Sequence, residues 1–385
     1  MRFILSRENV FEYLIEQKLC SKEQYPVQIK PKLCKNFNLL VTFPNNRHLL
    51  VKQEPDDGEE DISEGFINEW RIQEFCQKFP DSYIQPLVSE AIHFDLQRSI
   101  IVFNYLNNYC DLSDFYAKEH IFPTAIAAAI GRSLATVHRT TLDSTEYKNF
   151  FLPKGEESTH IPNFLSKLER IEPEIFAVVS ADNLKFFELF QRYDSLAQAI
   201  AQLNTAFEPC CLMHNDLKLN NILLHNQWQQ VSASSGNIVR LIDWESYTWG
   251  DPAYDLGTII ASYLKIWLQS LAISTAIDVE SALRLAITPL EQLQPSIATL
   301  TKAYLDNFPE IIQRRPDFLK LVVQFSGYGL IEKIKARIQY QEPFGNTGIC
   351  MLQVAKTLIC QPMQSIPTVF GTTADQLSSF SSITA

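Results

Sequence analysis

Short apolar runs separated by turn residues mark the first 105 residues as a region of β-strands. Runs of about four to eight apolar or alternating residues that end at Gly, Pro, Asn or Asp are typical of strands. Five segments fit this description: 27–34, 37–43, 48–54, 91–96 and 99–105. Between the third and the fourth, Ile72, Phe75, Cys76 and Phe79 recur at helical spacing and predict one long helix near 63–79. The pattern therefore predicts an antiparallel sheet with one inserted helix.

Beyond residue 106 the apolar spacing becomes helical. It predicts helices from Pro123, over 183–206 and over most of 256–361, with a short β island at 211–243. Prolines and scattered charges over 141–182 indicate an insertion or lid. We therefore predict an α+β fold with a β-rich lobe over 1–104 and a larger, mainly helical lobe over 105–362. The Ser/Thr-rich residues 363–385 predict a loose tail.

Composition narrows the class of protein. Apolar residues make up 46% and charged residues 20%, which fits a globular protein and excludes a wholly disordered chain. The net charge of −11 argues against nucleic-acid and membrane partners. None of the eight cysteines has zinc-ligand spacing, which favours a reducing compartment. With no signal peptide and no clean membrane span, we expect a cytoplasmic protein.

The strongest chemical signal is a polar loop between two apolar runs, over 211–224. His214-Asn215-Asp216-Leu217-Lys218 is followed by Leu219-Asn220-Asn221, so Asp216 and Asn221 are five residues apart in a short loop. A second apolar segment, over 239–245, delivers Asp243 at its end. Carboxylate and amide oxygens are the hard ligands that Mg²⁺ prefers. The two segments therefore supply side chains of the kind that suits Mg²⁺.

These motifs, together with Gly250-Asp251-Pro252 and the residues that follow, resemble the aminoglycoside phosphotransferase family. That family includes choline, homoserine, fructosamine and methylthioribose kinases, and it shares its fold with protein kinases. The resemblance covers roughly residues 25–345. It implies a two-lobed, protein-kinase-like fold, with ATP and Mg²⁺ as cofactors and a small-molecule hydroxyl as the phosphate acceptor.

The resemblance also implies roles for single residues in the loop and in the metal segment. Asp216 would accept or orient the proton of the attacking hydroxyl, and Asn221 and Asp243 would hold Mg²⁺ on the phosphates. Lys218 would touch the transferred phosphate, as a lysine in that slot does in protein kinases, although it also fits a solvent-facing lysine. His214 is expected to support the loop. Asn215, Leu219 and Asn220 depart from the usual HGDLHPGN, but none of these changes removes a catalytic group.

The nucleotide-binding residues are expected in the β-rich lobe. Lys52, on the third strand, fits the lysine that anchors ATP, and its expected partner is a glutamate of the inserted helix. Glu69 lies about 70° from the apolar stripe of that helix and Glu74 about 150°, so Glu69 is the better candidate. The first glycine is Gly58, so no Gly-rich loop precedes Lys52. Two short segments complete the expected site: the turn Lys35-Asn36 over the phosphates, and the hinge Phe103-Asn104-Tyr105 beside the adenine.

The acceptor is less defined by the sequence. Asp243 is only eight residues from Asp251, and the chain has no DFG and no APE motif, which argues against a protein kinase. Two alternatives stay open: a kinase of a peptide or carrier-bound hydroxyl, and a nucleotide-binding pseudokinase. Acidic stretches at 156–157 and 170–174 would suit a cationic acceptor, but they also fit a solvated face.

Overall fold

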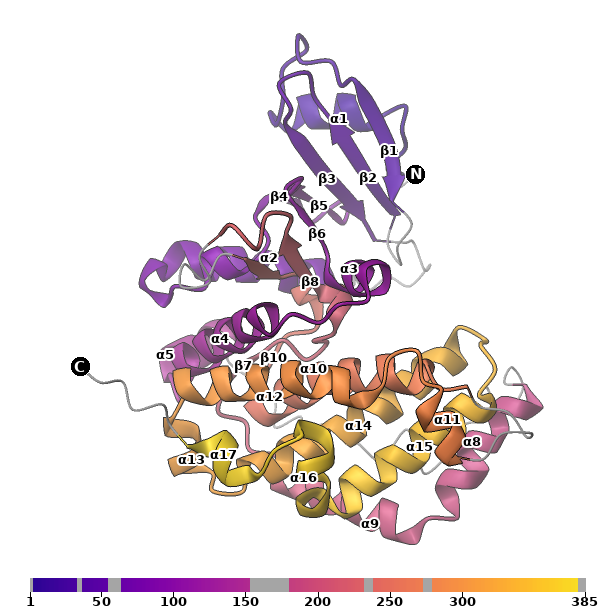
Figure 1. Cartoon of the computed structure of the whole chain (residues 1–385). Helices are drawn as coiled ribbons and strands as arrows, with labels where there is room; N and C mark the ends of the chain where they lie inside the picture. Colours follow the sequence, from indigo (N-terminus) through magenta and orange to yellow (C-terminus); the bar gives the residue numbers. More distant parts are fainter. Residues whose placement is uncertain are drawn as a thin grey trace. The chain divides into compact units, whose positions relative to one another are not determined.

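The chain divides into two compact units. The computed structural model describes residues 3–32, 37–54, 64–152, 180–231, 238–272 and 279–379. The first unit comprises Met1–Asp111 and Asn221–Tyr247, and the second comprises Leu112–Asn220 and Thr248–Ala385. Residues 221–247 thus return to the first unit, whereas the sequence placed them in the second lobe. They return because strand β8 (Ile222–His225) pairs with strand β6 (Tyr109–Asp111) (Figure 1).

A five-stranded sheet forms most of the first unit. Its strands lie in the order β1-β2-β3-β5-β4, and every neighbouring pair is antiparallel. The strands are β1 (Gln28–Lys32), β2 (Phe37–Thr42), β3 (His48–Gln53), β4 (Ala91–Asp95) and β5 (Ile100–Asn104). The predicted five strands are therefore confirmed, and their register places Lys52 opposite Ile101.

The two faces of the sheet are covered by different helices, because alternate residues of each strand point to opposite sides. Leu49 and Val51 of β3 pack with buried residues of helix α1 (Val10–Glu16). Ile101 and Phe103 of β5 pack with Phe66 of helix α2 (Glu64–Lys78) on the other face. Helix α2 confirms the long helix predicted near 63–79. Lys52 alternates with Val51 and so lies on the face that α2 covers.

A second, smaller sheet completes the first unit. It has the antiparallel order β6-β8-β9, with β9 at Val239–Leu241. Short 3₁₀ helices stand at Pro80–Ser82, Gln85–Leu87, Leu219–Asn221 and Trp244–Ser246. Strands β8 and β9 deliver Asn221 and Asp243 at neighbouring ends, because Ile222 pairs with Leu241.

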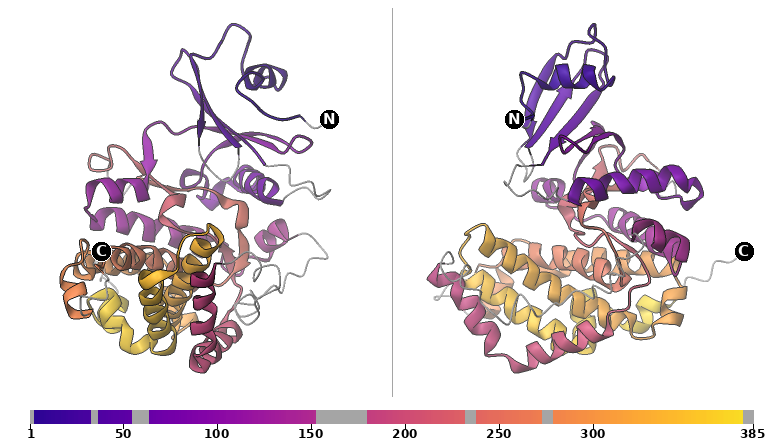
Figure 2. Two further views of the ribbon diagram at one scale, coloured as in Figure 1. Left: turned by 90° about the vertical axis from the view of Figure 1, so that its right-hand side faces the viewer. Right: turned by 180° about the vertical axis from the view of Figure 1, so that it is seen from behind.

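The second unit is mainly helical, as predicted. Its strands β7 (Cys211–Met213) and β10 (Thr248–Gly250) pair antiparallel. Its helices are α3 (Leu112–Glu119), α4 (Thr124–Thr141), α5 (Thr145–Phe151), α8 (Ala181–Gln191), α9 (Asp194–Ala206), α10 (Pro252–Gln269), α11 (Val279–Arg284), α12 (Leu290–Asn307), α13 (Glu310–Arg314), α14 (Phe318–Gln339), α15 (Gly345–Cys360), α16 (Pro362–Phe370) and α17 (Ala374–Ser378). The helices after residue 250, drawn orange to yellow, gather into one bundle (Figure 2).

Glycines allow the central helices of this bundle to touch. A Cβ on Gly131 of α4 would come within 2.2 Å of the carbonyl oxygen of Leu300 in α12, and one on Gly257 of α10 within 2.6 Å of Phe325 in α14. A side chain at either position would push two helices apart. These contacts fix α10, which begins directly after β10, against the rest of the unit.

Two parts of the second unit differ from the sequence expectation. Residues 363–379 are not a loose tail, because Ile366, Val369 and Phe370 form an apolar stripe on α16 and are buried. The Ser/Thr content that indicated looseness instead supplies a helix cap, since Thr373 and Gln376 form a capping box. The helix expected over 183–206 is two helices, α8 and α9, which break at residues 192–193.

The structure leaves the expectations for the 141–182 insertion and for the cytoplasmic location untested. The predicted insertion at 141–182 lies largely outside the described residues, as do the acidic stretches within it. Over the described ranges, no helix combines the length and the apolar character needed to cross a membrane. The cytoplasmic location stays a prediction.

Candidate active site

Lys52 and Asp243 form an ion pair inside the first unit. The ammonium Nζ of Lys52 lies 3.0 Å from Oδ1 of Asp243, and the Lys52 side chain is only 14% exposed. The same ammonium lies 5.1 Å from the ring centroid of Phe103, a hinge residue that is itself buried. Residues far apart in the sequence therefore meet at one point of the first unit.

The charges around Lys52 keep it protonated. Burial lowers the pKa of this lysine, but the negative charges of Asp243 and Glu69 outweigh that effect and raise its pKa above the ordinary value. A lysine held in this state is a fixed positive charge. Such a charge can position phosphate oxygens.

Glu69 is the glutamate of α2 that faces the interior, as its helical angle predicted. It is 3% exposed, its Oε1 accepts a hydrogen bond from Ser89 Oγ at 3.4 Å, and it also accepts from the main-chain N–H of Trp244. Glu74 instead lies on the exposed side of the helix, where it accepts from the indole of Trp70. Burial raises the pKa of Glu69 to about 7; the charge of Lys52 lowers it, while Asp243 and Glu245 raise it further.

The predicted pairing of Lys52 with Glu69 takes a different form. Among the described residues, Lys52 makes its close ion pair with Asp243, and Glu69 acts on Lys52 through its charge. Burial raises the pKa of Glu69, and a carboxyl group that holds its proton more readily is a weaker ion-pair partner for a lysine.

Asn221 and Asp243 are held by the β8–β9 pair. The N–H of Ile242 donates to the carbonyl of Asn221 at 2.9 Å, and Asn221 is 4% exposed. Asp243 adopts a left-handed backbone conformation with φ of +67°, which is uncommon for a residue other than glycine. The buried indole of Trp244 donates to the carbonyl of Leu241 and holds this turn.

The donor set at this point fits Mg²⁺ better than a softer metal. A carboxylate and an amide oxygen are hard ligands, and Mg²⁺ commonly takes few protein ligands and completes its shell with phosphates and water. Within the described ranges, no group of three or more His, Cys, Asp and Glu side chains could hold a metal ion by itself.

The hinge residues are already engaged within the sheet. The N–H of Asn104 donates to the carbonyl of Glu90, and the N–H of Tyr105 donates to that of His48, both at 3.0 Å. The phenol of Tyr105 accepts from Lys32 at 3.0 Å. An adenine ring placed beside this segment would have to form its hydrogen bonds with other groups of the segment, because these two N–H groups are already engaged. Lys35 and Asn36 lie outside the described residues.

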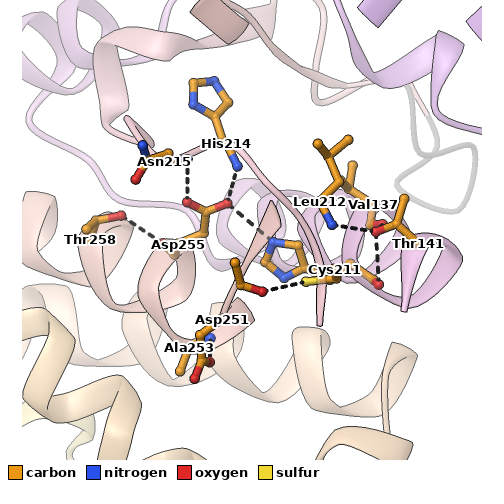
Figure 3. Close-up of polar contacts among 12 residues, drawn as sticks. Val137, Thr141, Cys211, Leu212, His214, Asn215, Asp251, Ala253, Asp255 and Thr258 are labelled. Atoms are coloured by element: carbon orange, nitrogen blue, oxygen red, sulfur yellow. Dashed lines mark hydrogen bonds and ion pairs between the residues drawn. The ribbon is translucent and has the colours of Figure 1, made fainter. Parts of the chain in front are cut away.

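In the second unit, the buried carboxylate of Asp255 holds the loop that begins at His214. Its Oδ2 accepts the main-chain N–H of His214 at 2.6 Å, and its Oδ1 accepts that of Asn215 at 3.0 Å (Figure 3). Asp255 and His214 are both 0% exposed. The Asp255 carboxylate therefore holds the main chain at the start of this loop, where the His214 side chain is fully buried.

Two residues of α4 that the sequence analysis missed strengthen this support. Nε2 of His138 lies 3.3 Å from Oδ2 of Asp255, and its Nδ1 lies 2.9 Å from the Tyr304 hydroxyl. Thr141 Oγ1 accepts the N–H of Leu212 in β7 (Figure 3). Both residues follow the apolar pattern of α4, so nothing in the sequence separated them from ordinary core positions.

Asp251 has a structural role at the start of α10. Its Oδ1 accepts the N–H of Ala253 and so caps α10, and its Oδ2 lies 2.8 Å from Nη1 of Arg315. Asp251 is 1% exposed, and the Arg315 side chain is 11% exposed. The pair fixes the start of α10, one turn before Asp255.

Asp216 stands on the loop that Asp255 braces. Its Oδ2 lies 2.7 Å from Nζ of Lys218, and both side chains are about 40% exposed. Asn215 has φ of +66°, a conformation that glycine and asparagine tolerate best. Asparagine therefore suits the position where the related motif has glycine, and the loop keeps its expected course.

Comparison with known families identifies the chain. Residues 74–284, more than half of the sequence, match the model of the phosphotransferase enzyme family. The chain belongs to this family. The predicted family and the predicted phosphotransferase class are thereby confirmed. No curated protein matches the phosphotransferase closely enough to be counted as a relative.

Solved structures resembling this phosphotransferase share little sequence with it. The choline kinase LicA of Streptococcus pneumoniae is 16% identical, with a TM-score of 0.41 over 91% of this chain and 99% of that one. A putative fructosamine-3-kinase of Thermobifida fusca is 12% identical, with a TM-score of 0.46 over 88% and 95%. A macrolide 2′-phosphotransferase of Brachybacterium faecium is 12% identical, with a TM-score of 0.41 over 92% and 99%.

Proposed function

We propose that this phosphotransferase moves the γ-phosphate of Mg·ATP to a hydroxyl of a small molecule, with Asp216 as the base. The observation that carries the proposal is the anchoring of the Asp216 loop by two main-chain hydrogen bonds to Asp255. A loop fixed in this way holds a carboxylate at a constant position, and positioning provides most of the catalysis in phosphoryl transfer.

The residues of the first unit suit the nucleotide. Lys52 would bind phosphate oxygens, and Glu69 would keep that lysine charged. Asn221 and Asp243 would hold Mg²⁺, which neutralises charge on the phosphates when it is bound. On binding, Asp243 would exchange part of its contact with Lys52 for the metal, and Lys52 would turn to the phosphates.

The residues of the second unit suit the acceptor. Asp216 would take a hydrogen bond from the attacking hydroxyl and receive its proton late in the transfer, because the transition state is loose. Lys218 lies 2.7 Å from Asp216 and would contact the transferred phosphate. Both roles need the side chains to be accessible, and both side chains are partly exposed.

Thermal melting with Mg·ATP and transfer of labelled phosphate to a library of hydroxyl compounds together test this proposal. We expect Mg·ATP to raise the melting temperature of the parent and of Asp216→Asn equally. We expect kcat for the best acceptor to fall by about 10²–10⁴-fold in Asp216→Asn. The matched control is Asp306→Asn on α12, whose carboxylate pairs with Lys302 at the surface.

Each failure has a distinct meaning. A parent that binds Mg·ATP but transfers phosphate to no compound would favour a pseudokinase, and transfer only to peptides would favour the carrier-bound alternative. Equal transfer by the parent and Asp216→Asn would show that Asp216 is not the base.

A further inference from the structure

Helices α10 and α14 run side by side in the same direction. Gly257 of α10 lies against Phe325 of α14, and Gly329 of α14 lies against Ala261 of α10. Between these contacts the chain advances four residues, about one turn, on both helices. One further turn brings Lys265 of α10 beside Lys333 of α14. The charge of Lys265 acts on Lys333, as this register implies, so two lysines lie near each other on a tightly packed helix pair.

The carboxylates around these two lysines are already paired with other cations. Asp216 pairs with Lys218 at 2.7 Å, and Glu342 pairs with Arg337 at 2.9 Å. Glu332 accepts from the Tyr328 hydroxyl at 2.7 Å and from Lys335 at 2.8 Å.

Within the described ranges, no carboxylate lies at ion-pair distance from Lys265 or Lys333. Neither forms an ion pair or a hydrogen bond with any residue in the described part of the chain, and both are half-buried. The desolvation of an ammonium group costs free energy, and no nearby carboxylate that the structure describes is paired with it to offset that cost.

The electrostatics of the cluster agree with this geometry. Burial lowers the pKa of Lys333 to about 7; the charges of Lys265 and Lys218 lower it further, and those of Asp216 and Glu332 oppose the shift. Burial and the charge of Arg337 also lower the pKa of Lys265. The cluster therefore contains more positive charge than the surrounding groups neutralise, and a bound anion would remove the imbalance.

We propose that the acceptor of this phosphotransferase carries an anionic group, a phosphate or a carboxylate, which Lys265 and Lys333 bind beside Asp216. The inference rests on the proposed function, since it assigns a substrate class to the same site. Lys333 is close enough to Asp216 and Lys218 for their charges to act on it, so one small molecule could present a hydroxyl to Asp216 and an anion to the lysines. A cationic acceptor would meet two uncompensated ammonium groups, so it is disfavoured.

Calorimetric titration of the full chain tests the proposal with simple probes. Inorganic phosphate, glycerol 3-phosphate and L-malate serve as anions, and choline serves as a cation. The variants are Lys265→Gln and Lys333→Gln, and the control is Lys320→Gln, an exposed lysine on the same helix α14. We expect the parent and the control to bind the anions but not choline. We expect at least a tenfold loss of anion affinity in Lys265→Gln and in Lys333→Gln, with melting temperatures showing that both variants are folded.

A second titration distinguishes the acceptor's anion from the transferred phosphate. With a non-hydrolysable Mg·ATP analogue at saturation, we expect glycerol 3-phosphate to bind with the same affinity, and we expect the lysine variants to bind the analogue as the parent does. Displacement of glycerol 3-phosphate by the analogue, together with weaker analogue binding in the variants, would assign the lysines to the nucleotide and overturn the proposal.

Two further outcomes also decide the matter. Anion binding that is absent in the parent, or unchanged in both lysine variants, would overturn the inference while leaving the proposed function intact. A parent that binds anions but not the Mg·ATP analogue would instead overturn the proposed function, because the nucleotide would then have no site.

Discussion

The carboxylate of Asp255 accepts the main-chain N–H of His214 at 2.6 Å, so a residue of helix α10 sets the path of the loop that presents Asp216. The same carboxylate also accepts the N–H of Asn215. Helix α10 is itself fixed by the Asp251 cap and by close packing on α14. The position of the proposed base therefore depends on a buried group that has no direct part in the chemistry.

Replacement of Asp255 by asparagine is expected to cost both stability and activity. Asparagine would turn an amide N–H₂ toward one of two main-chain N–H donors, and a buried donor without an acceptor costs about 1–3 kcal/mol. We expect the free energy of unfolding in urea to fall by about 2–4 kcal/mol. The surface variant Asp306→Asn should change it by less than about 0.5 kcal/mol.

If Asp255→Asn unfolds at the same urea concentration as the parent, Asp255 does not stabilise the loop through these hydrogen bonds. Activity should fall with kcat rather than with KM for ATP, because the loop in the second unit is displaced while the nucleotide residues are not. A loss confined to KM for ATP would argue against this division.

Asp243→Ala is expected to abolish turnover without unfolding the chain. The Asp243 side chain is 32% exposed, and Glu69 remains to compensate the charge of Lys52, so the stability change should stay near 1 kcal/mol. Loss of the proposed metal ligand should lower kcat by at least about 10²-fold. Transfer of labelled phosphate and calorimetric titration with Mg²⁺ and ATP measure the two effects.

The comparison variant is Asp95→Asn, a carboxylate of the same unit that lies 3.9 Å from Arg98. It should transfer phosphate like the parent. Parental turnover by Asp243→Ala would remove the assignment of this residue to the metal.

The sequence predicted those features of the first unit that follow from local periodicity. The apolar run over 48–54 predicted strand β3, and with it the place of Lys52 on that strand, as the structure shows. The helical angle of Glu69 predicted its burial for the same reason. Both outcomes depend only on residues within one strand or one helix.

Features that depend on how two elements pack were beyond the sequence. Lys265 and Lys333 became neighbours because glycines set the register of α10 against α14, and no local pattern contains that register. The close contact of Lys52 with Asp243 is equally a tertiary effect, since Lys52 belongs to β3 and Asp243 follows β9. The tail was misread because its Ser and Thr residues were taken as signs of looseness, whereas Thr373 caps a helix.

Glu69 should make the chain less stable as the pH rises. Its pKa is raised to about 7 in the folded state, above the ordinary glutamate value, so its favourable contribution is complete below about pH 4 and is lost as the pH rises through 7. Between pH 5 and 8, the free energy of unfolding of the parent should fall by about 2–3 kcal/mol more than that of Glu69→Gln. Urea unfolding of both proteins in EDTA measures this difference.

The control for Glu69 is Glu74→Gln on the exposed side of the same helix. It should follow the parental pH profile. Parallel profiles for the parent and Glu69→Gln would mean that this carboxylate titrates normally.

Lys333 should have the opposite effect on the pH dependence of stability. The groups that face it are Lys265 from α10, Asp216 and Lys218 from the loop, and Glu332 on its own helix. Because its pKa is lowered to about 7, the unfolded chain binds more protons than the folded chain between pH 7 and 10, and stability rises with pH there. The substitution Lys333→Met removes this pH-dependent contribution to the free energy of unfolding.

Between pH 7 and 9, we therefore expect the free energy of unfolding of the parent to rise by about 2 kcal/mol more than that of Lys333→Met. The measurement needs a buffer free of phosphate and carboxylate, because a bound anion would hold the proton on Lys333 and flatten the profile. Addition of phosphate should flatten it for the parent alone. If the profiles of the parent and Lys333→Met stay parallel in both buffers, the surroundings of Lys333 already compensate its charge. The lysine cluster would then have no uncompensated charge with which to attract an anion.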